Sequence, residues 1–486
     1  MRRSIGSLLF LLSIAVVSFA AGYFVRHRQS AILAVVPPTQ IADLLPEETD
    51  SVHTDDKHTA CTELFIALIS SRDRVAIFEA TTAIEREWHP GFAVMLVECV
   101  PFIRSDAVRE AAIEVLEKRT GQQFGPDLNA WYRWIWREEI AVHSDYAMFK
   151  AALYSRVDSR FQEYFTSAEK ASIRLDEIRW GGVRRDGIPP LKDPKVLSAA
   201  AADYLAASDI VFGIEVNGEA RAYPKRILAW HEMVKDSVGG ESINGVYCTL
   251  CGSMIVYRTN LGDTHYELGT SGFLYRSNKL MYDHATKSLW STLDGKPVVG
   301  SLVGQGIKLE PLSVVTTSWG RWRNEHPDTT VLSLETGHRR DYGEGVAYHD
   351  YFATDELMFA VPELDTRLQN KDEVLAIRLD EVRDERLAIS VEYLNRHRVY
   401  HDRIGETEFV VLTDEGGENR VYESKAFQFV KQIARGRLLA SDGREWEVSE
   451  SQLVTQAGEE VLRRLPAHRA FWFGWYAAFP ATRLVK

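Results

Sequence analysis

Two cysteines three positions apart are the strongest chemical feature of this sequence. Cys248 and Cys251 lie in residues 245–253, between apolar runs that have the composition of β-strands. Gly252 directly follows the second thiol, and glycine accepts the backbone conformations that a tight turn requires. The pattern predicts a partly exposed turn that brings both sulfurs into one small space, where they would react ahead of Cys61 and Cys99.

Three kinds of site fit such a thiol pair. A copper(I)-type soft-metal site needs only the two sulfurs, with His231 as the third ligand that we expect. Zinc needs two more ligands, the sequence offers no second Cys-x-x-Cys, and none of the histidines at 231, 265, 284, 326, 338 and 349 belongs to an H-x-x-x-H pair. We therefore predict a metal site at Cys248, Cys251 and His231, with copper ahead of zinc. A redox dithiol, a structural disulfide or zinc clip, and a His231 that only packs are the alternatives.

Four further polar residues are candidates for a substrate-binding patch. Arg340, Asp341 and Tyr342 fall in a segment between two β-rich regions, where a cleft between domains would place them. Asp283 follows an apolar run and could orient a base. An ion-pair network for the first three residues, and a turn for Asp283, are the alternatives. The sequence contains no Gly-rich phosphate loop, no G-x-S-x-G and no H-E-x-x-H, so those enzyme classes have no support.

The N-terminus has the pattern of a membrane segment. Arg2 and Arg3 precede an uncharged, mostly apolar run from Ser4 to Val25, which is long enough to span a bilayer as a helix. Positive charge before the run favours an N-terminus inside the cell and a body outside the cytoplasm. We predict a single-pass anchor over residues 1–28, with a cleaved signal peptide as the alternative, followed by a linker over residues 29–58.

A helical region and a β-rich region are expected to follow. Residues 59–140 show apolar residues at helical spacing, including Val75 and Phe78, with a second such helix between Ser105 and Gly121. A period near thirty residues indicates HEAT-like helical pairs, which could hold a protein partner. Tryptophans at 131, 134 and 136 are predicted to pack this region onto the next domain, with a binding platform as the alternative.

The second half of the chain shows an internal repeat. The pattern Trp319-x-x-Trp322 followed by Pro327-x-Thr329 recurs at positions 472–482. We therefore predict an α+β protein with a connecting region over 141–204, a first β-rich copy over 205–332, a joining segment over 333–373 and a second copy over 374–486. In this alignment Leu412 and Glu415 take the places of the two cysteines, which makes the thiols a special feature of the first copy.

Composition narrows the class of protein. The chain has 486 residues, 45% hydrophobic and 26% charged, which is ordinary for a folded protein of several domains. Its net charge of −12 comes without a basic stripe, so a nucleic-acid partner is not expected. Four cysteines are too few for a disulfide framework in a chain of this length.

The second half of the chain contains a series of short sequence blocks: Arg221-Ala222-Tyr223-Pro224, His231-Glu232-Met233-Val234, Tyr247-Cys248-x-x-Cys251-Gly252, Ser271-Gly272-x-Leu274-x-x-Ser277-Asn278, Met281-Tyr282-Asp283, Ser288-Leu289-Trp290, Arg340-Asp341-Tyr342 and Phe471-Trp472-Phe473-Gly474-Trp475. In this order the blocks resemble a family catalogued only as domain of unknown function 3179. The resemblance covers residues 209–486. It implies a location in the cell envelope and a site near the cysteine pair, and it supplies no reaction.

Two functions are compatible with all these patterns. The first is a membrane-tethered extracytoplasmic enzyme, metal-dependent or redox, whose thiol site is covered by the joining segment. The second is a non-catalytic envelope scaffold, in which the helical region recruits a partner and the cysteines form a structural disulfide or zinc clip.

Overall fold

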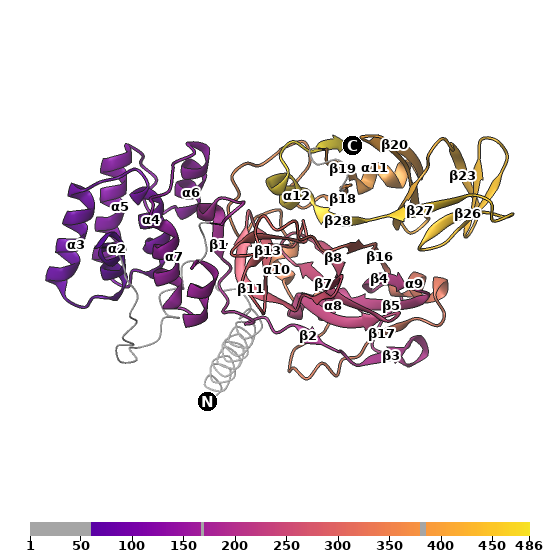
Figure 1. Ribbon diagram of the computed structural model, residues 1–486, viewed down its shortest axis with the longest axis horizontal. Helices are drawn as coiled ribbons and strands as arrows, with labels where there is room; N and C mark the ends of the chain where they lie inside the picture. The colour runs from indigo at the N-terminus through magenta and orange to yellow at the C-terminus, as the bar shows by residue number, and fades with distance from the viewer. Residues whose placement is uncertain (1–59, 167–169, 380–384) are drawn as a thin grey trace, which may run out of the picture.

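The computed structural model describes residues 60–166, 170–379 and 385–486. A helical region stands at one end of the molecule and a β-rich body at the other (Figure 1). The predicted α+β class is therefore confirmed. The predicted anchor over 1–28 and the linker over 29–58 lie outside the described residues. Within the three described ranges, no helix combines the length and the apolar character needed to cross a membrane.

Six α-helices build the helical region as far as the structure describes it: α2 (Ala60–Ser70), α3 (Arg74–Arg86), α4 (Phe92–Cys99), α5 (Asp106–Thr120), α6 (Leu128–Arg137) and α7 (Tyr146–Ser155). Helix α2 packs against α3, α4 and α7, and α3 packs against α5. The predicted ends of α5 are confirmed, because Ser105 is its N-cap and Gly121 ends it in the left-handed conformation at φ 72°.

The predicted core face of α3 was wrong. Val75 and Phe78 are 62% and 72% exposed, and the helix buries Ala80 and Ile84 instead. Helix α3 lies at the outer end of the helical region in Figure 1, so only its inner side has neighbours. Apolar residues occur on both sides of this helix, and their spacing alone does not tell which side meets α2 and α5.

The tryptophan-rich helix α6 packs the helical region onto the body, as predicted. Trp131, Trp134 and Trp136 are all buried, and the Trp136 Nε1 donates a hydrogen bond to the carbonyl oxygen of Asp176 at 3.3 Å. A second link is fully buried: Lys150 forms an ion pair with Glu98 and donates to the Ile178 carbonyl. The two regions therefore share one continuous core.

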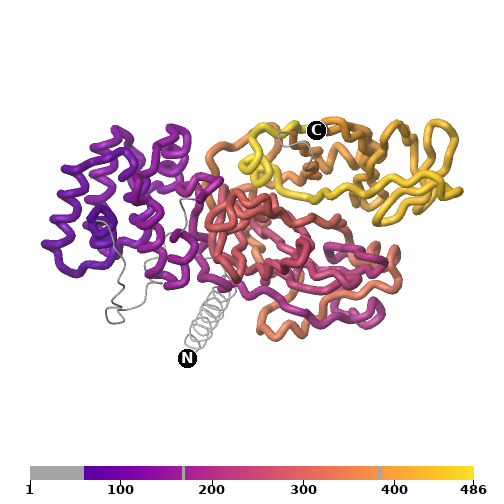
Figure 2. The backbone as a smooth tube through the Cα atoms, in the orientation of Figure 1, coloured from indigo at the N-terminus to yellow at the C-terminus, as the bar shows by residue number. Residues whose placement is uncertain are grey.

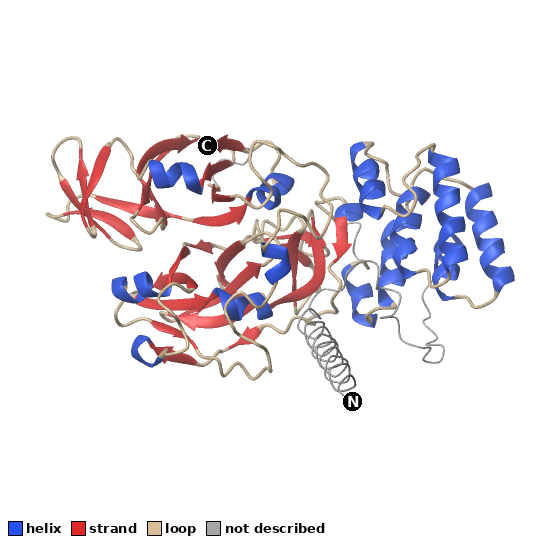
Figure 3. Ribbon diagram, turned by 180° about the vertical axis from the view of Figure 1, so that it is seen from behind, coloured by secondary structure: helices blue, strands red, loops and turns tan. Residues whose placement is uncertain are grey.

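The body consists mainly of antiparallel strands, seen from behind in Figure 3. The predicted first copy contains β4 (Ile210–Val216), β5 (Glu219–Pro224), α8 (Lys225–His231), β6 (Met233–Val238), β7 (Glu241–Cys248), β8 (Ser253–Arg258), β15 (Pro311–Leu312), β16 (Val315–Ser318), α9 (Trp319–Glu325) and β17 (Thr330–Leu332). An insertion within it contains β9 (Asn260–Leu261), β10 (Thr264–His265), β11 (Leu268–Tyr275), β12 (Asn278–Asp283), β13 (Leu289–Ser291) and β14 (Lys296–Val299).

The remaining elements extend or follow this unit. The predicted connecting region contributes β1 (Ile178–Trp180), β2 (Leu191–Lys192) and β3 (Val196–Ser198), and the joining segment contains α10 (His349–Phe352). The second β-rich region contains β18 (Glu373–Ile377), β19 (Leu387–Ser390), α11 (Val391–Arg396), β20 (Val399–Ile404), β21 (Thr407–Thr413), β22 (Asn419–Glu423), β23 (Phe429–Ala434), β24 (Arg437–Ala440), β25 (Glu445–Val448), β26 (Gln452–Thr455), β27 (Val461–Leu465), β28 (Ala467–Phe471), α12 (Trp472–Ala478) and β29 (Arg483–Val485).

The two β-rich regions share their strand order. The order β16-β4-β5-β17 corresponds to β28-β18-β19-β29, with the last pair parallel in both, and β15-β8-β7-β6 corresponds to β27-β22-β21-β20. The repeated sequence pattern makes the same contact twice. Trp322 Nε1 donates to Thr329 Oγ1 at 2.9 Å, and Trp475 Nε1 donates to Thr482 Oγ1 at 3.0 Å. In Figure 2 the two regions run side by side.

Strand pairing corrects the alignment at the cysteines. The β6–β7 hairpin closes on the pair Val238–Glu241, and the β20–β21 hairpin closes on Ile404–Thr407. Counted from these pairs, Asp414 takes the place of Cys248, two positions after the Leu412 that the sequence comparison indicated. The two turns also differ, since Cys248 pairs with Ser253 whereas Thr413 pairs with Asn419.

Candidate functional site

The two cysteines stand at the turn between β7 and β8. Cys248 ends β7 and pairs with Ser253, so residues 249–252 form the loop between them. Gly252 has a φ of 60°, and the Cys251 N–H donates to the Cys248 carbonyl at 3.2 Å. The two Sγ atoms are 3.0 Å apart, and both residues are free cysteines. The predicted turn and the predicted approach of the two sulfurs are both present.

The thiols are buried, which corrects the expectation of a partly exposed turn. Cys248 is 3% exposed and Cys251 is 1% exposed, whereas Cys61 is only half-buried. Two separate parts of the chain cover the turn. From the second β-rich region, the Phe471 N–H donates to the Cys251 carbonyl at 2.7 Å, and from the joining segment, the Tyr351 hydroxyl donates to the Leu250 carbonyl at 2.8 Å.

Two glycines make this close packing feasible. An added Cβ at Gly252 would lie 2.9 Å from the ring of Phe471, in addition to the strain of a positive φ. An added Cβ at Gly474, on α12, would lie 3.3 Å from the Cys251 Sγ. The second β-rich region therefore approaches the thiols more closely than a larger residue at either position would allow.

The two thiols differ in pKa. The hydrogen bond between the sulfurs lowers the pKa of Cys248, because a thiolate there accepts the proton of Cys251. Burial raises the pKa of Cys251. When Cys248 is protonated and donates to Cys251, the Cys251 thiol can donate instead to the Ser277 carbonyl oxygen, 3.2 Å from its Sγ. Cys248 is therefore the better thiolate and nucleophile of the two.

A small cavity of about 30 Å³ adjoins Cys248. Its polar wall is formed by five side chains that sequence reasoning did not select: Glu232, Thr249, Thr270, Lys279 and Tyr348. Glu232 forms a buried ion pair with Lys279 and accepts hydrogen bonds from the hydroxyls of Thr249 at 2.8 Å and Tyr348 at 2.9 Å. A thiol and a proton-carrying network thus face one enclosed space.

The backbone at Glu232 is strained. This residue caps the C-terminus of α8 in the left-handed conformation at φ 55°, which non-glycine residues rarely adopt. Such strain concentrates at functional sites, where packing holds it in place. The sequence did indicate this residue, since Glu232 lies in the block His231-Glu232-Met233-Val234, but the prediction selected only His231 from that block.

His231 is not brought to the thiols as a ligand. Its Nδ1 lies 2.8 Å from the Pro189 carbonyl and its Nε2 lies 2.6 Å from the Tyr342 hydroxyl, so both ring nitrogens have partners. Burial lowers the pKa of His231 to about 4, which keeps the ring neutral. In the described ranges, the groups of three or more metal-ligating side chains with donor atoms within 4.8 Å are Cys61–His143–Asp145 and Glu325–His326–Glu450.

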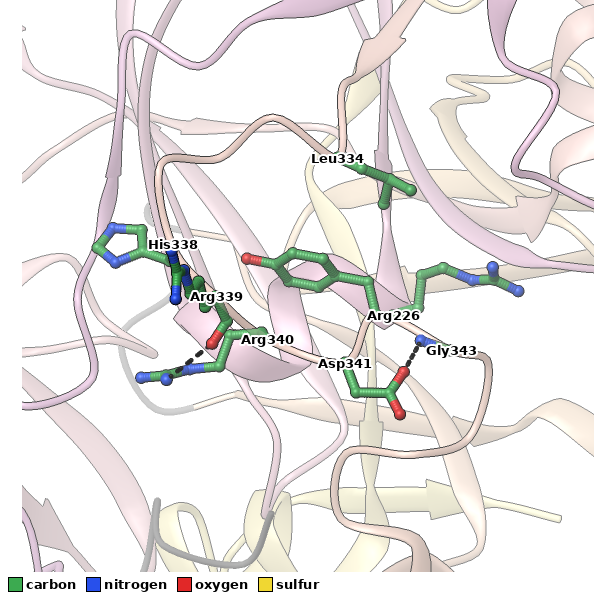
Figure 4. Close-up of a pocket in the computed structure, with 8 residues that line it drawn as sticks. Arg226, Leu334, His338, Arg339, Arg340, Asp341 and Gly343 are labelled. Atoms are coloured by element: carbon green, nitrogen blue, oxygen red, sulfur yellow. Dashed lines mark hydrogen bonds between the residues drawn. The ribbon is translucent and has the colours of Figure 1, made fainter. Parts of the chain in front are cut away.

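The predicted substrate patch separates into two places. Arg340, Asp341 and Tyr342 line an open pocket of about 790 Å³ on the joining segment (Figure 4), completed by Arg226, Leu334, His338, Arg339 and Gly343. Within it, the Asp341 carboxylate accepts a hydrogen bond from the Gly343 N–H at 2.9 Å. The Tyr342 hydroxyl links this pocket to His231, whose neighbour Glu232 faces the thiol cavity.

Asp283 lies elsewhere and has a structural environment. It is buried at the turn after β12, where its carboxylate accepts hydrogen bonds from the backbone of Ala285, Thr286 and Ser288 and from the Trp290 indole. These contacts are those of a turn-forming aspartate, the alternative that the sequence left open.

A known family model covers most of the β-rich body. Residues 185–482 match the model of the family described as protein of unknown function DUF3179. The chain belongs to the DUF3179 family. No curated protein and no solved structure was found to match the chain.

The sequence blocks of the DUF3179 domain meet around the cysteines. The His231-Glu232 block supplies the carboxylate, and the block ending at Ser277-Asn278 supplies the carbonyl near Cys251. The Asn278 Nδ2 donates to the Gly474 carbonyl at 2.9 Å, which fixes the closing aromatic block over the turn. Blocks that are far apart in the DUF3179 sequence thus converge on one site.

Proposed function

We propose that the DUF3179 domain carries a dithiol–disulfide redox site in which Cys248 attacks and Cys251 resolves. The observation that supports it best is the 3.0 Å separation of the Sγ atoms. Two sulfurs bound to one tetrahedral zinc at about 2.3 Å each would be roughly 3.8 Å apart. A disulfide requires about 2.05 Å, so a small closure of the turn joins the sulfurs, whereas a shared metal requires it to open.

The roles of the two thiols follow from their surroundings. Cys248 faces the cavity and has the lowered pKa, while Cys251 packs against Gly474 and does not line the cavity. The Glu232–Lys279 pair lies beside Cys248, where it can supply or accept a proton as the thiol changes its redox state.

The wider functional setting is also a proposal. The N-terminal sequence supports a single-pass anchor with the body outside the cytoplasm, a compartment in which dithiols cycle with disulfides. The shared strand order supports a duplication of one β-rich unit, of which the first copy carries the thiols. The packing of α2–α3 beside α4–α5 supports HEAT-like pairs that hold a protein partner.

The test measures the redox state and the metal content of the same sample. Full-length protein is purified anaerobically in detergent and equilibrated with mixtures of reduced and oxidised dithiothreitol, and free thiols are counted by alkylation and mass spectrometry. We expect a reversible Cys248–Cys251 disulfide, lost in Cys248→Ser and in Cys251→Ser. Cys61→Ser is the matched control and should leave the transition unchanged.

Two results would reject the proposal. Stoichiometric copper or zinc that disappears with either cysteine would establish the metal site that the sequence predicted. A disulfide that native protein never releases to dithiothreitol would establish a structural clip, and with it the scaffold function.

A further inference from the structure

We propose that the oxidant of this site is a small hydroperoxide, with hydrogen peroxide as the smallest member of the class. The inference rests on the proposed redox function and adds the substrate. It follows from the size of the cavity at Cys248, from its enclosure and from the polar groups that line it.

The cavity admits only a few atoms. At about 30 Å³ it has room for one or two water-sized molecules. The remaining wall is mostly apolar. It includes the buried side chains of Ile188, Leu250, Phe273 and Leu274 and the half-buried Val183. A protein or glutathione disulfide would have to place a sulfur and both of its carbon chains in line with the Cys248 sulfur. Exchange with such a disulfide, as with dithiothreitol, requires the wall to open and is therefore slower than attack on a small peroxide.

The polar wall suits a hydroperoxide. The hydroxyls of Thr249 and Tyr348 and the ammonium of Lys279 stand with Glu232 along the cavity that Cys248 faces. The two hydroxyls already donate to Glu232, so Lys279, with its three N–H donors, is the group that can stabilise the oxygen that leaves when an O–O bond breaks. Lys279 is 7% exposed at its side chain, so its charge acts in a site that excludes bulk water.

The chemistry balances with the groups present and the named oxidant. The Cys248 thiolate attacks one oxygen of ROOH, the O–O bond breaks, and an S–O bond forms to give a sulfenic acid. The departing RO⁻ takes a proton from the Lys279–Glu232 pair and leaves as ROH. The Cys251 thiol then displaces water from the sulfenic acid and forms the disulfide. The two thiols give up two electrons, and the peroxide is reduced by two.

The experiment compares oxidants of different size on the reduced full-length protein. Disulfide formation is followed by mass spectrometry with hydrogen peroxide, cumene hydroperoxide and oxidised glutathione at equal concentration. We expect hydrogen peroxide to react at least about tenfold faster than either larger oxidant, because a larger molecule would overpack the buried site. Cys251→Ser should stop at a sulfenic acid on Cys248, trapped by dimedone.

A variant with a larger cavity should reduce the discrimination against the larger oxidant. Leu274→Ala enlarges the cavity beside Cys248. The variant should form the disulfide several-fold faster with cumene hydroperoxide, because the overpacking is relieved, and at nearly the same rate with hydrogen peroxide. Leu394→Ala is the matched control, since Leu394 is also buried but lies in the core of the second β-rich region.

The outcomes separate the two proposals. Oxidised glutathione reacting as fast as hydrogen peroxide would overturn the substrate class and leave the redox site intact. Oxidation of Cys248 no faster than that of the half-buried Cys61 would also overturn it. If no oxidant produces the Cys248–Cys251 disulfide, the proposed function itself fails.

Discussion

At the scale of single residues, the ion pair between Glu232 and Lys279 is the feature of the site that is most costly to bury. Both side chains are less than 10% exposed, and each charge is desolvated on folding. Such a pair contributes little net stability compared with apolar residues, but the loss of one partner leaves a buried charge uncompensated. The pair is therefore better explained by the chemistry beside Cys248 than by a contribution to folding.

We predict that Lys279→Met destabilises the protein by roughly 3 kcal/mol, measured as the free energy of unfolding in urea. The matched control is Lys195→Met, because Lys195 forms an exposed ion pair with Glu335. That change should leave the unfolding free energy close to that of wild type, because an exposed ion pair contributes little to stability. Similar small losses in both variants would mean that the charge of Glu232 reaches solvent.

A second residue-scale prediction concerns Glu418, at the turn that corresponds to the cysteine turn. Burial and the hydrogen bond and charge of Asp414 raise the pKa of Glu418 from an ordinary 4.5 to about 7. Between these values the folded protein binds more protons than the unfolded chain, so stability falls as the pH rises through that window.

Glu418→Gln should remove this dependence. Relative to the variant, wild-type protein is expected to lose roughly 2 kcal/mol of unfolding free energy between pH 4.5 and pH 8, measured by urea denaturation across the range. Glu415→Gln, at an exposed position of the same turn, is the control and should track wild type. Parallel curves for all three proteins would contradict the prediction.

At the scale of elements, helix α12 and the cysteine turn form one unit although they are more than two hundred residues apart in sequence. Gly474 lets the helix lie against Cys251, and the Phe471 N–H fixes the strand before it to the Cys251 carbonyl. An alanine at position 474 suits a helix better than glycine, by about 1 kcal/mol, but brings a Cβ to 3.1 Å from the Cys251 Cβ.

We predict that the overpacking cost exceeds the helix gain, so that Gly474→Ala destabilises by about 1 kcal/mol. Thermal and urea unfolding measure the change. The same substitution in a Cys251→Ala background should cost less, because the sulfur that it meets is gone. Equal costs in both backgrounds would mean that the sulfur of Cys251 is not the source of the strain.

At the scale of the whole molecule, the thiol site depends on three parts of the chain at once. The first β-rich region holds the cysteines, the joining segment contributes Tyr348 and Tyr351, and the second region contributes Phe471 and Phe473. A site assembled in this way should not survive the removal of one part.

We therefore predict that a fragment of residues 170–373 exposes the apolar surface around the cysteine turn and associates or unfolds. Size-exclusion chromatography and urea unfolding report on it, with residues 60–486 as the control that keeps both regions. A monomeric fragment that unfolds cooperatively would show that the first region is complete without the second.

The local features could be predicted from the sequence alone. The Cys-x-x-Cys turn, the limits of α5, the packing role of the tryptophans and the family were all readable, because each depends on residues close together or on a specific motif. A hairpin pairs neighbours along the chain, so its turn residues and alternating apolar pattern suffice to indicate it.

The surroundings of the thiols could not be predicted from the sequence, because they depend on tertiary packing. His231 and Glu232 are adjacent in sequence, yet one faces Tyr342 and the other faces Lys279 and Cys248, because α8 ends between them in a left-handed turn. The burial of the turn depends on Phe471, which lies far along the chain. Contacts of this kind are set by how separate elements pack, and no local pattern encodes which faces will meet.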